Sequence, residues 1–171
     1  QVVAQAQTQP APQSDFQRLL EKPNERSVEF VPYGSADKIK LTVEIVQKFI
    51  ATPTKKGAIC SVRDAVRFIM MCQARRLNPF EGDAFLNGYD TQDGPQFSLI
   101  TSHQAFLKRA EGNEHYDGME SGIVVLIDDV PQDRDGDFHM PQEVVVGGWA
   151  RVHCKGRSFP TYRRIRMAGI E

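Results

Sequence analysis

The residues best suited to chemistry lie near the end of the chain, where cationic and aromatic side chains occupy alternate positions. They are Trp149, Arg151, His153 and Lys155, followed by Tyr162, Arg164 and Arg166. Alternate residues of a β-strand share one face, so an antiparallel pair would present cations interleaved with two rings if the two faces coincide. Cations neutralise phosphates and aromatic rings stack on bases, which predicts a surface for a nucleic-acid backbone. An ordinary solvated face is the alternative.

Other cations could extend such a surface. Lys108 and Arg109 end a predicted short helix, where they would also interact favourably with the helix dipole, so a purely local role stays open. Lys55 and Lys56 lie in a predicted flexible loop, and Arg76 lies near the end of a longer helix. Phosphate binding depends more on charge than on fixed geometry, so the set predicts a site better than any single member.

Charge is strongly segregated along the chain, although the net value is only −1. Residues 31–76 carry nine Lys/Arg against three acidic residues, residues 77–148 carry three against fourteen, and residues 149–171 carry six against one. This asymmetry predicts an anionic partner held by two basic segments, with the acidic middle facing elsewhere or contacting another subunit. Ordinary solvated faces would give the same counts.

Two helices are predicted before residue 80. Thr42 is a suitable N-cap for a helix over residues 43–50, whose apolar stripe includes Phe49. Ser61 is a suitable N-cap for a second helix, whose apolar face continues to Leu77. Pro79 then forbids further helix, and the pattern changes to strand-like alternation.

A β-hairpin and a short helix follow. Phe85 and Tyr89 would share one face of a strand, and the chain would return over residues 97–99 after an Asp/Gly turn. Ser102 can cap a short helix in which Phe106 and Ala110 pack inward while Lys108 and Arg109 project outward. Gly112 suits the left-handed position after that helix.

Three further strands complete the predicted fold, over residues 123–127, 143–154 and 159–167, with residues 128–142 as an exposed loop. The class is therefore α+β, with N-terminal helices, a β-hairpin, a short helix and an antiparallel β-meander. Residues 1–14 are rich in Gln and predict a disordered tail, which leaves residues 15–171 as one ordered core.

The acidic loop 128–137 suggests an alternative chemistry. Its spacing does not fit a calcium loop of the EF-hand type, because the required Gly and Glu positions hold Phe138 and Val144. A metal-dependent nuclease would need further carboxylates from other elements. The four histidines and three cysteines lack zinc-ligand spacing, and no phosphate-binding Gly-rich loop ending in Lys-Ser/Thr occurs, which disfavours a nucleotide-driven recombinase.

Composition limits the remaining classes. A 40% hydrophobic and 25% charged chain of 171 residues fits an ordinary globular protein with one core. No apolar run approaches the ~20 residues of a membrane span, and no secretory signal is present. Cys60, Cys72 and Cys154 do not form a disulfide framework, so a reducing cytoplasm is expected. The first residue is Gln rather than Met, as expected of a fragment or of a processed chain.

Several short motifs together resemble the RecT/Bet (Redβ-like) family of phage single-strand annealing proteins. The motifs occupy residues 72–80, 82–86, 106–110, 116–119 and 148–157. The resemblance implies an annealing-protein fold that pairs complementary single strands without ATP and holds the new duplex in a basic groove of an oligomeric ring or helical filament. It also implies no catalytic residue and no cofactor. A protein-interaction module using Trp149 and the aromatic hairpin is a third hypothesis.

The resemblance also implies the site and its partners. The strongest phosphate contacts it suggests are Lys108, Arg151, Lys155 and Arg157; the full DNA-binding set adds Arg109, Arg164, Arg166, Arg76, Lys55 and Lys56. Gly82 stands where some relatives carry Lys. The implied partners are single-stranded DNA, annealed duplex DNA, further copies of the chain, a phage exonuclease and the host single-strand-binding protein, in the bacterial cytoplasm. Relatives continue into a further basic helix, so a C-terminal truncation is expected.

Overall fold

The computed structural model describes residue 17, residues 20–21 and residues 27–167. These residues belong to two compact units that divide between Arg109 and Ala110, called unit 1 and unit 2 below. Helices and mostly antiparallel sheets confirm the predicted α+β class. The predicted tail, residues 1–14, lies outside the described residues. None of the described helices has the length and apolar character needed to cross a membrane.

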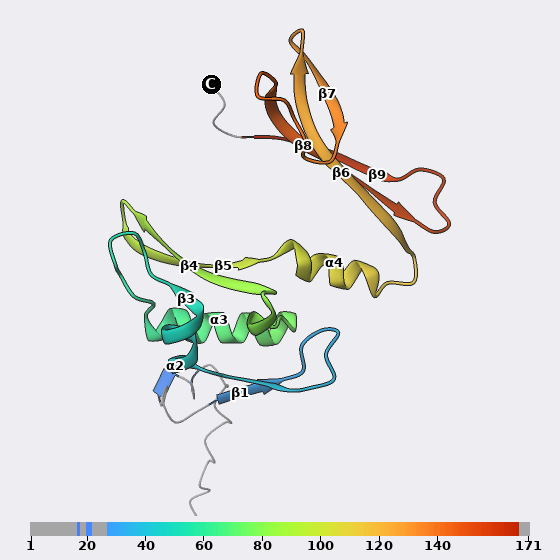
Figure 1. Cartoon of the computed structure of the whole chain (residues 1–171). Helices are drawn as coiled ribbons and strands as arrows, with labels where there is room; N and C mark the ends of the chain where they lie inside the picture. Colours follow the sequence, from blue (N-terminus) through green and yellow to red (C-terminus); the bar gives the residue numbers. More distant parts are fainter. Residues whose placement is uncertain (1–16, 18–19, 22–26, 168–171) are drawn as a thin grey trace, which may run out of the picture. The chain divides into compact units, whose positions relative to one another are not determined.

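Unit 1 packs short sheets around one long helix (Figure 1). Its elements are β1 (Ser27–Phe30), β2 (Ile39–Thr42), α2 (Val43–Ile45), the π-helical turn η1 (Val46–Ile50), β3 (Ala51–Thr52), α3 (Val62–Arg75), the 3-10 turn η2 (Pro79–Glu81), β4 (Ala84–Thr91), β5 (Gly94–Thr101) and α4 (His103–Glu111), which crosses into unit 2. β1 pairs with β2, and β3 runs parallel to β4 beside the antiparallel β4–β5 hairpin.

The predicted helix starts are confirmed. The Thr42 hydroxyl oxygen accepts the backbone N–H of Ile45 at 3.1 Å, and the Ser61 oxygen accepts that of Asp64 at 3.1 Å. Each side chain satisfies a donor that the first helical turn leaves unpaired. α3 ends where Arg76 takes a left-handed conformation, with φ 51°. The next residue, Leu77, is buried as predicted.

The core of unit 1 lies along one face of α3. Val66, Phe68, Ile69 and Cys72 recur at helical spacing, and all are almost fully buried. Burial raises the pKa of the Cys72 thiol to about 12 and, together with the nearby Asp64 carboxylate, that of Cys60 to about 11. Both thiols are therefore protonated at neutral pH and serve as small core residues.

Two aromatic residues expected in the core are exposed. Phe49 is 79% exposed and Phe106 is 60% exposed. The π-helical turn at Val46–Ile50 is wider than an α-helical turn, so it rotates Phe49 off the predicted stripe. α4 buries Ala105 rather than Phe106. α4 ends at Glu111, directly before Gly112 as predicted, but Gly112 is not in the left-handed region.

Unit 2 is built on a four-stranded antiparallel sheet in the order β7-β6-β8-β9. Its strands are β6 (Tyr116–Ile127), β7 (Val130–Asp135), β8 (Val144–Cys154) and β9 (Thr161–Arg166) (Figure 1). The prediction of an exposed loop over residues 128–142 is wrong for β7. Asp128 and Asp129 both have positive φ, 50° and 61°, as a two-residue hairpin turn requires. Asp tolerates that conformation better than most side chains, so two acidic residues make the turn rather than a loop.

Candidate nucleic-acid interface

The pairing of β8 with β9 places the predicted cationic positions on one face. Trp149 lies opposite Arg164, and Arg151 lies opposite Tyr162. Directly opposed residues of an antiparallel pair point to the same side of the sheet. The predicted coincidence of the two strand faces is therefore confirmed, and Arg166 continues the row along β9. We call this surface the β8–β9 face.

Trp149 has a structural position on this face. Its side chain is only 5% exposed, and its indole N–H donates to the backbone carbonyl of Arg134 at 3.0 Å. The Arg151 guanidinium lies 5.3 Å from the Trp149 ring centroid and 5.8 Å from that of Tyr162. The expectation that Trp149 offers bases an open stacking platform is therefore wrong. The ring instead ties β8 to β7 and supports Arg151.

Two carboxylates from neighbouring strands form ion pairs with the arginines of the β8–β9 face. Glu120 of β6 accepts a hydrogen bond from Arg151 at 2.7 Å, and its second oxygen lies 3.2 Å from the His153 ring nitrogen. Asp133 of β7 accepts two hydrogen bonds from Arg164, at 3.0 and 2.6 Å. The charges of both guanidinium groups are therefore balanced by carboxylates of unit 2.

Asp133 is held as an anion by its neighbours. Desolvation by itself would raise the pKa of this carboxyl, but the Tyr162 hydroxyl and the Arg164 guanidinium, both hydrogen-bonded to it, lower the pKa overall. The hydrogen bond to Asp133 in turn raises the pKa of Arg164. The pair is fully ionised at neutral pH.

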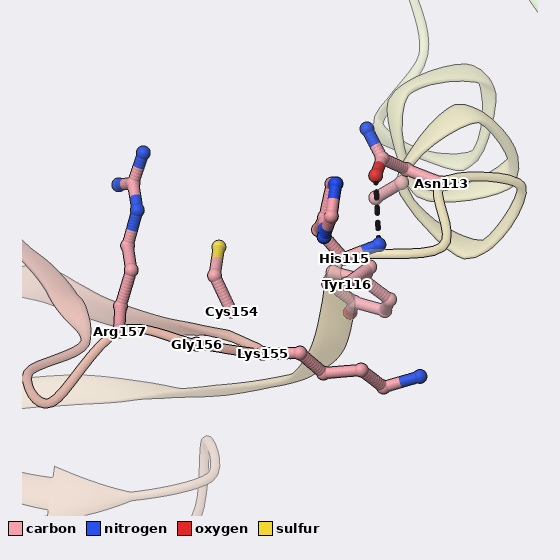
Figure 2. A pocket seen from close by; sticks show the side chains of 8 residues that line it. Asn113, His115, Tyr116, Cys154, Lys155, Gly156 and Arg157 are labelled. Atoms are coloured by element: carbon pink, nitrogen blue, oxygen red, sulfur yellow. Dashed lines mark hydrogen bonds between the residues drawn. The ribbon is translucent and has the colours of Figure 1, made fainter.

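A hollow of about 540 Å³ lies at the end of the sheet where β6 begins and β8 ends. Its lining residues are Ala110, Asn113, His115, Tyr116, Cys154, Lys155, Gly156 and Arg157. Figure 2 shows Arg157, Cys154 and His115 pointing to one side, while Lys155 extends away from Arg157. The hollow is fixed by the backbone, because the Lys155 N–H donates to the His115 carbonyl at 2.8 Å. Two cations thus border one hollow from different directions.

The exposed cations of unit 2 differ in whether they form ion pairs or hydrogen bonds within the unit. Within the described part of unit 2, Lys155, Arg157 and Arg166 form no ion pair. Arg163, on the opposite face of β9, donates to the carbonyl of Tyr162 at 2.9 Å. Lys155, Arg157 and Arg166 are therefore the cations most open to an external phosphate in this unit.

Lys108 forms ion pairs with two acidic residues of unit 1. Its ammonium group lies 3.0 Å from the Asp83 carboxylate and 3.1 Å from that of Glu81, and the Asp83 side chain is only 4% exposed. The hydrogen bond to Asp83 raises the pKa of Lys108. The expectation that Lys108 simply projects outward is wrong, since it balances the charge of a buried acid.

Arg109 and Arg76 hold backbone segments of unit 1 together. Arg109 donates to the carbonyl of Arg75, and its guanidinium lies 5.8 Å from the Tyr33 ring centroid. Arg76 donates to the carbonyls of Val31, at 3.1 Å, and of Pro32, at 3.4 Å. These contacts give both arginines a structural role.

Lys55 and Lys56 lie on an exposed turn of unit 1, closed by a hydrogen bond from the Gly57 N–H to the Thr54 carbonyl at 2.9 Å. The backbone N–H of Lys56 donates to the Asp90 carboxylate at 3.0 Å. These hydrogen bonds give the turn a defined position, whereas the sequence predicted a flexible loop. Of the ten predicted contacts, these two and Lys108, Arg109 and Arg76 belong to unit 1, and the other five belong to unit 2.

The acidic residues of the suggested nuclease loop are used differently. Among the described residues no group of three or more His, Cys, Asp or Glu side chains gathers as a metal-binding cluster. Asp128 and Asp129 form the hairpin turn, and Asp133 binds Arg164 and Tyr162. These positions give the nuclease hypothesis no structural support.

The sequence reasoning missed the acidic partners of the arginines. Glu120 meets Arg151 because β6 and β8 pair in a register that places these two residues directly opposite. The sequence predicts a loop at Asp133, so it does not predict the contact of Asp133 with Arg164. The Asp128-Asp129 pair between two β-prone stretches is the sequence signal that would have indicated this turn.

A comparison with protein-family models matches residues 36–171 to the RecT family. The chain therefore belongs to the RecT family, and this membership implies single-strand annealing in phage recombination. Neither the curated proteins nor the solved structures that were compared gave a match.

Proposed function

We propose that the chain binds single-stranded DNA through its sugar–phosphate backbone and anneals complementary strands without ATP. Membership of the RecT family supports this proposal. The observation that carries it further is the β8–β9 register, which aligns Arg151, Arg164 and Arg166 on one face. Cations in such a row neutralise phosphates irrespective of base sequence, which is what annealing of arbitrary complementary strands needs.

The proposed contacts fall into two groups. Lys155, Arg157 and Arg166 form no ion pair among the described residues of unit 2 and make the first contacts with phosphate. Arg151 and Arg164 join them once a strand lies along the face. Lys108, Arg109 and Arg76 act mainly by keeping unit 1 folded, and Lys55 and Lys56 add non-specific attraction.

Copies of the chain would assemble side by side, as a ring or helical filament, so that bases of a bound strand stay available for pairing. No bond is made or broken, and the proposal needs no catalytic residue or cofactor. A phage exonuclease and the host single-strand-binding protein are the proposed partners in the bacterial cytoplasm. Annealed duplex DNA is the product that remains bound.

Sequential addition of two complementary labelled oligonucleotides tests this function. We expect the protein, without ATP, to accelerate the approach of donor and acceptor dyes, measured by energy transfer. A non-complementary second strand is the control and should give no signal. With magnesium or manganese present, both strands should stay intact on a denaturing gel. Cleaved strands would instead support the nuclease hypothesis, and intact strands without faster pairing would contradict annealing.

A further inference from the structure

The carboxylates of Glu120 and Asp133 hold the arginines of the β8–β9 face in a geometry that a phosphate could also satisfy. Asp133 accepts both the Nε–H and an Nη–H of Arg164, at 3.0 and 2.6 Å. Glu120 accepts Arg151 at 2.7 Å. A guanidinium fork presents its N–H groups to carboxylate and phosphate oxygens in the same way, so these two acids mark where an anion fits on the face.

We propose that Glu120 and Asp133 occupy the phosphate positions of the β8–β9 face and must be displaced by an incoming strand, so that they set its affinity and its preference for polyanions. This inference rests on the proposed function, because it concerns the same surface. It assigns to two acidic residues a role in DNA binding that opposes that of the cations beside them.

The two ion pairs are exposed enough to open. The side chains of Arg164 and Asp133 are 43% and 29% exposed, and those of Arg151 and Glu120 are 39% and 52% exposed. Ion pairs in contact with water are weak, because solvent stabilises the separated charges almost as well. A phosphate can therefore replace a carboxylate, which then becomes hydrated.

The arrangement favours a strand over a single nucleotide. Arg166 lies opposite Gly147, and Lys155 follows the end of β8 eight residues after Gly147, so the two cations mark the ends of a row about 26 Å long. A single phosphate near the middle of this row meets only arginines whose charge is already balanced. A strand can bind the unpaired cations at the two ends and then displace the carboxylates between them. The expected ligand class is thus an extended polyphosphate backbone.

The test compares Asp133→Asn and Glu120→Gln with the wild type. Fluorescence anisotropy with a labelled oligothymidylate should show about fivefold tighter binding for each variant, as expected from releasing one exposed ion pair. Asp117→Asn is the matched control, since Asp117 is an exposed acid of unit 2 whose side chain has no ion pair or hydrogen bond among the described residues. It makes the same change in net charge and should raise affinity much less.

A double variant separates competition from a simple charge effect. In Arg164→Ala the further change Asp133→Asn should give no larger gain than Asp117→Asn, because the guanidinium that Asp133 binds directly is already gone. Thymidine monophosphate should compete poorly against the oligonucleotide with the wild type and better with Asp133→Asn. Unfolding curves of each variant, followed by the fluorescence of the single tryptophan, verify that unit 2 remains folded.

Three outcomes would overturn the inference. Weaker binding by Asp133→Asn would show that the carboxylate orients Arg164 for phosphate rather than competing with it. A gain no larger than that of Asp117→Asn would show a general charge effect. In both cases the wild type still binds DNA, so the proposed function stands. If neither the wild type nor any variant binds, both the proposed function and the inference fail.

Discussion

Replacing Lys108 with Met is expected to lower the free energy of unfolding of unit 1 by about 2–3 kcal/mol. The change leaves the Asp83 carboxylate almost fully buried, with the Asn78 N–H at 2.9 Å and no adjacent ammonium group. Breaking a fully buried ion pair costs about 3–5 kcal/mol, and the lower figure applies because the Lys108 side chain is 34% exposed and water can partly replace it. Urea unfolding followed by circular dichroism measures the loss.

The control and the pH dependence sharpen this prediction. Lys48→Met removes an ammonium group whose partner, Glu44, is exposed, so stability should hardly change. Because the pKa of Lys108 is raised above its ordinary value of 10.5, the stabilisation is fully present below pH 10.5 and is lost only as the pH rises through that higher pKa. The difference between Lys108→Met and wild type should therefore stay constant at neutral and mildly alkaline pH. If the free energy of unfolding of Lys108→Met equals that of the wild type, Lys108 has no structural role and is again a candidate DNA contact.

Replacing Gly122 with Ala is expected to destabilise unit 2 by about 2–4 kcal/mol. A Cβ atom at this position would lie 2.0 Å from the Arg134 carbonyl oxygen and 2.7 Å from the indole nitrogen of Trp149. Those two atoms form the hydrogen bond that joins β8 to β7, so the added methyl group must push them apart. The cost combines overpacking with the loss of a partly buried hydrogen bond.

The single tryptophan of the chain reports this change directly, because Trp149 is the residue displaced. Its fluorescence should shift towards longer wavelength, and the denaturant midpoint should fall. Gly148→Ala is the matched control, since its Cβ would make only an ordinary contact of 3.4 Å with the Gly122 carbonyl. Equal effects of the two substitutions would contradict the packing described for Gly122.

Local patterns were sufficient to predict much of the fold. The caps at Thr42 and Ser61, the apolar face of α3 and the strand alternation of β8 and β9 depend on neighbouring residues only. Phe49 was misplaced because the π-helical turn of η1 changes the helical period, which no propensity scale records. β7 was missed because two acidic residues form its turn.

The candidate site was less predictable than the fold, because charge alone does not reveal its partners. Lys108 and Arg164 look alike in the sequence, but one balances a buried acid and the other meets an acid on the sheet surface. These pairings join residues 25 and 31 positions apart, so they depend on the tertiary register rather than on local sequence. Among the predicted contacts in the described part of unit 2, only Lys155, Arg157 and Arg166 are both exposed and without an ion pair.

The most direct test of a phosphate-binding surface on unit 2 measures how the affinity of the protein for single-stranded DNA depends on salt concentration. We expect the full chain to bind an oligonucleotide with an affinity that falls by roughly 0.7 log units per log unit of salt for each phosphate neutralised. Lys155→Ala/Arg157→Ala should weaken binding equally for different base sequences and make this slope shallower by about 1.4. Lys38→Ala/Lys40→Ala, with the same charge change at exposed positions of unit 1, should leave the slope unaltered. An unaltered slope in the Lys155/Arg157 variant, or an equal decrease in both variants, would contradict a phosphate-binding surface on unit 2.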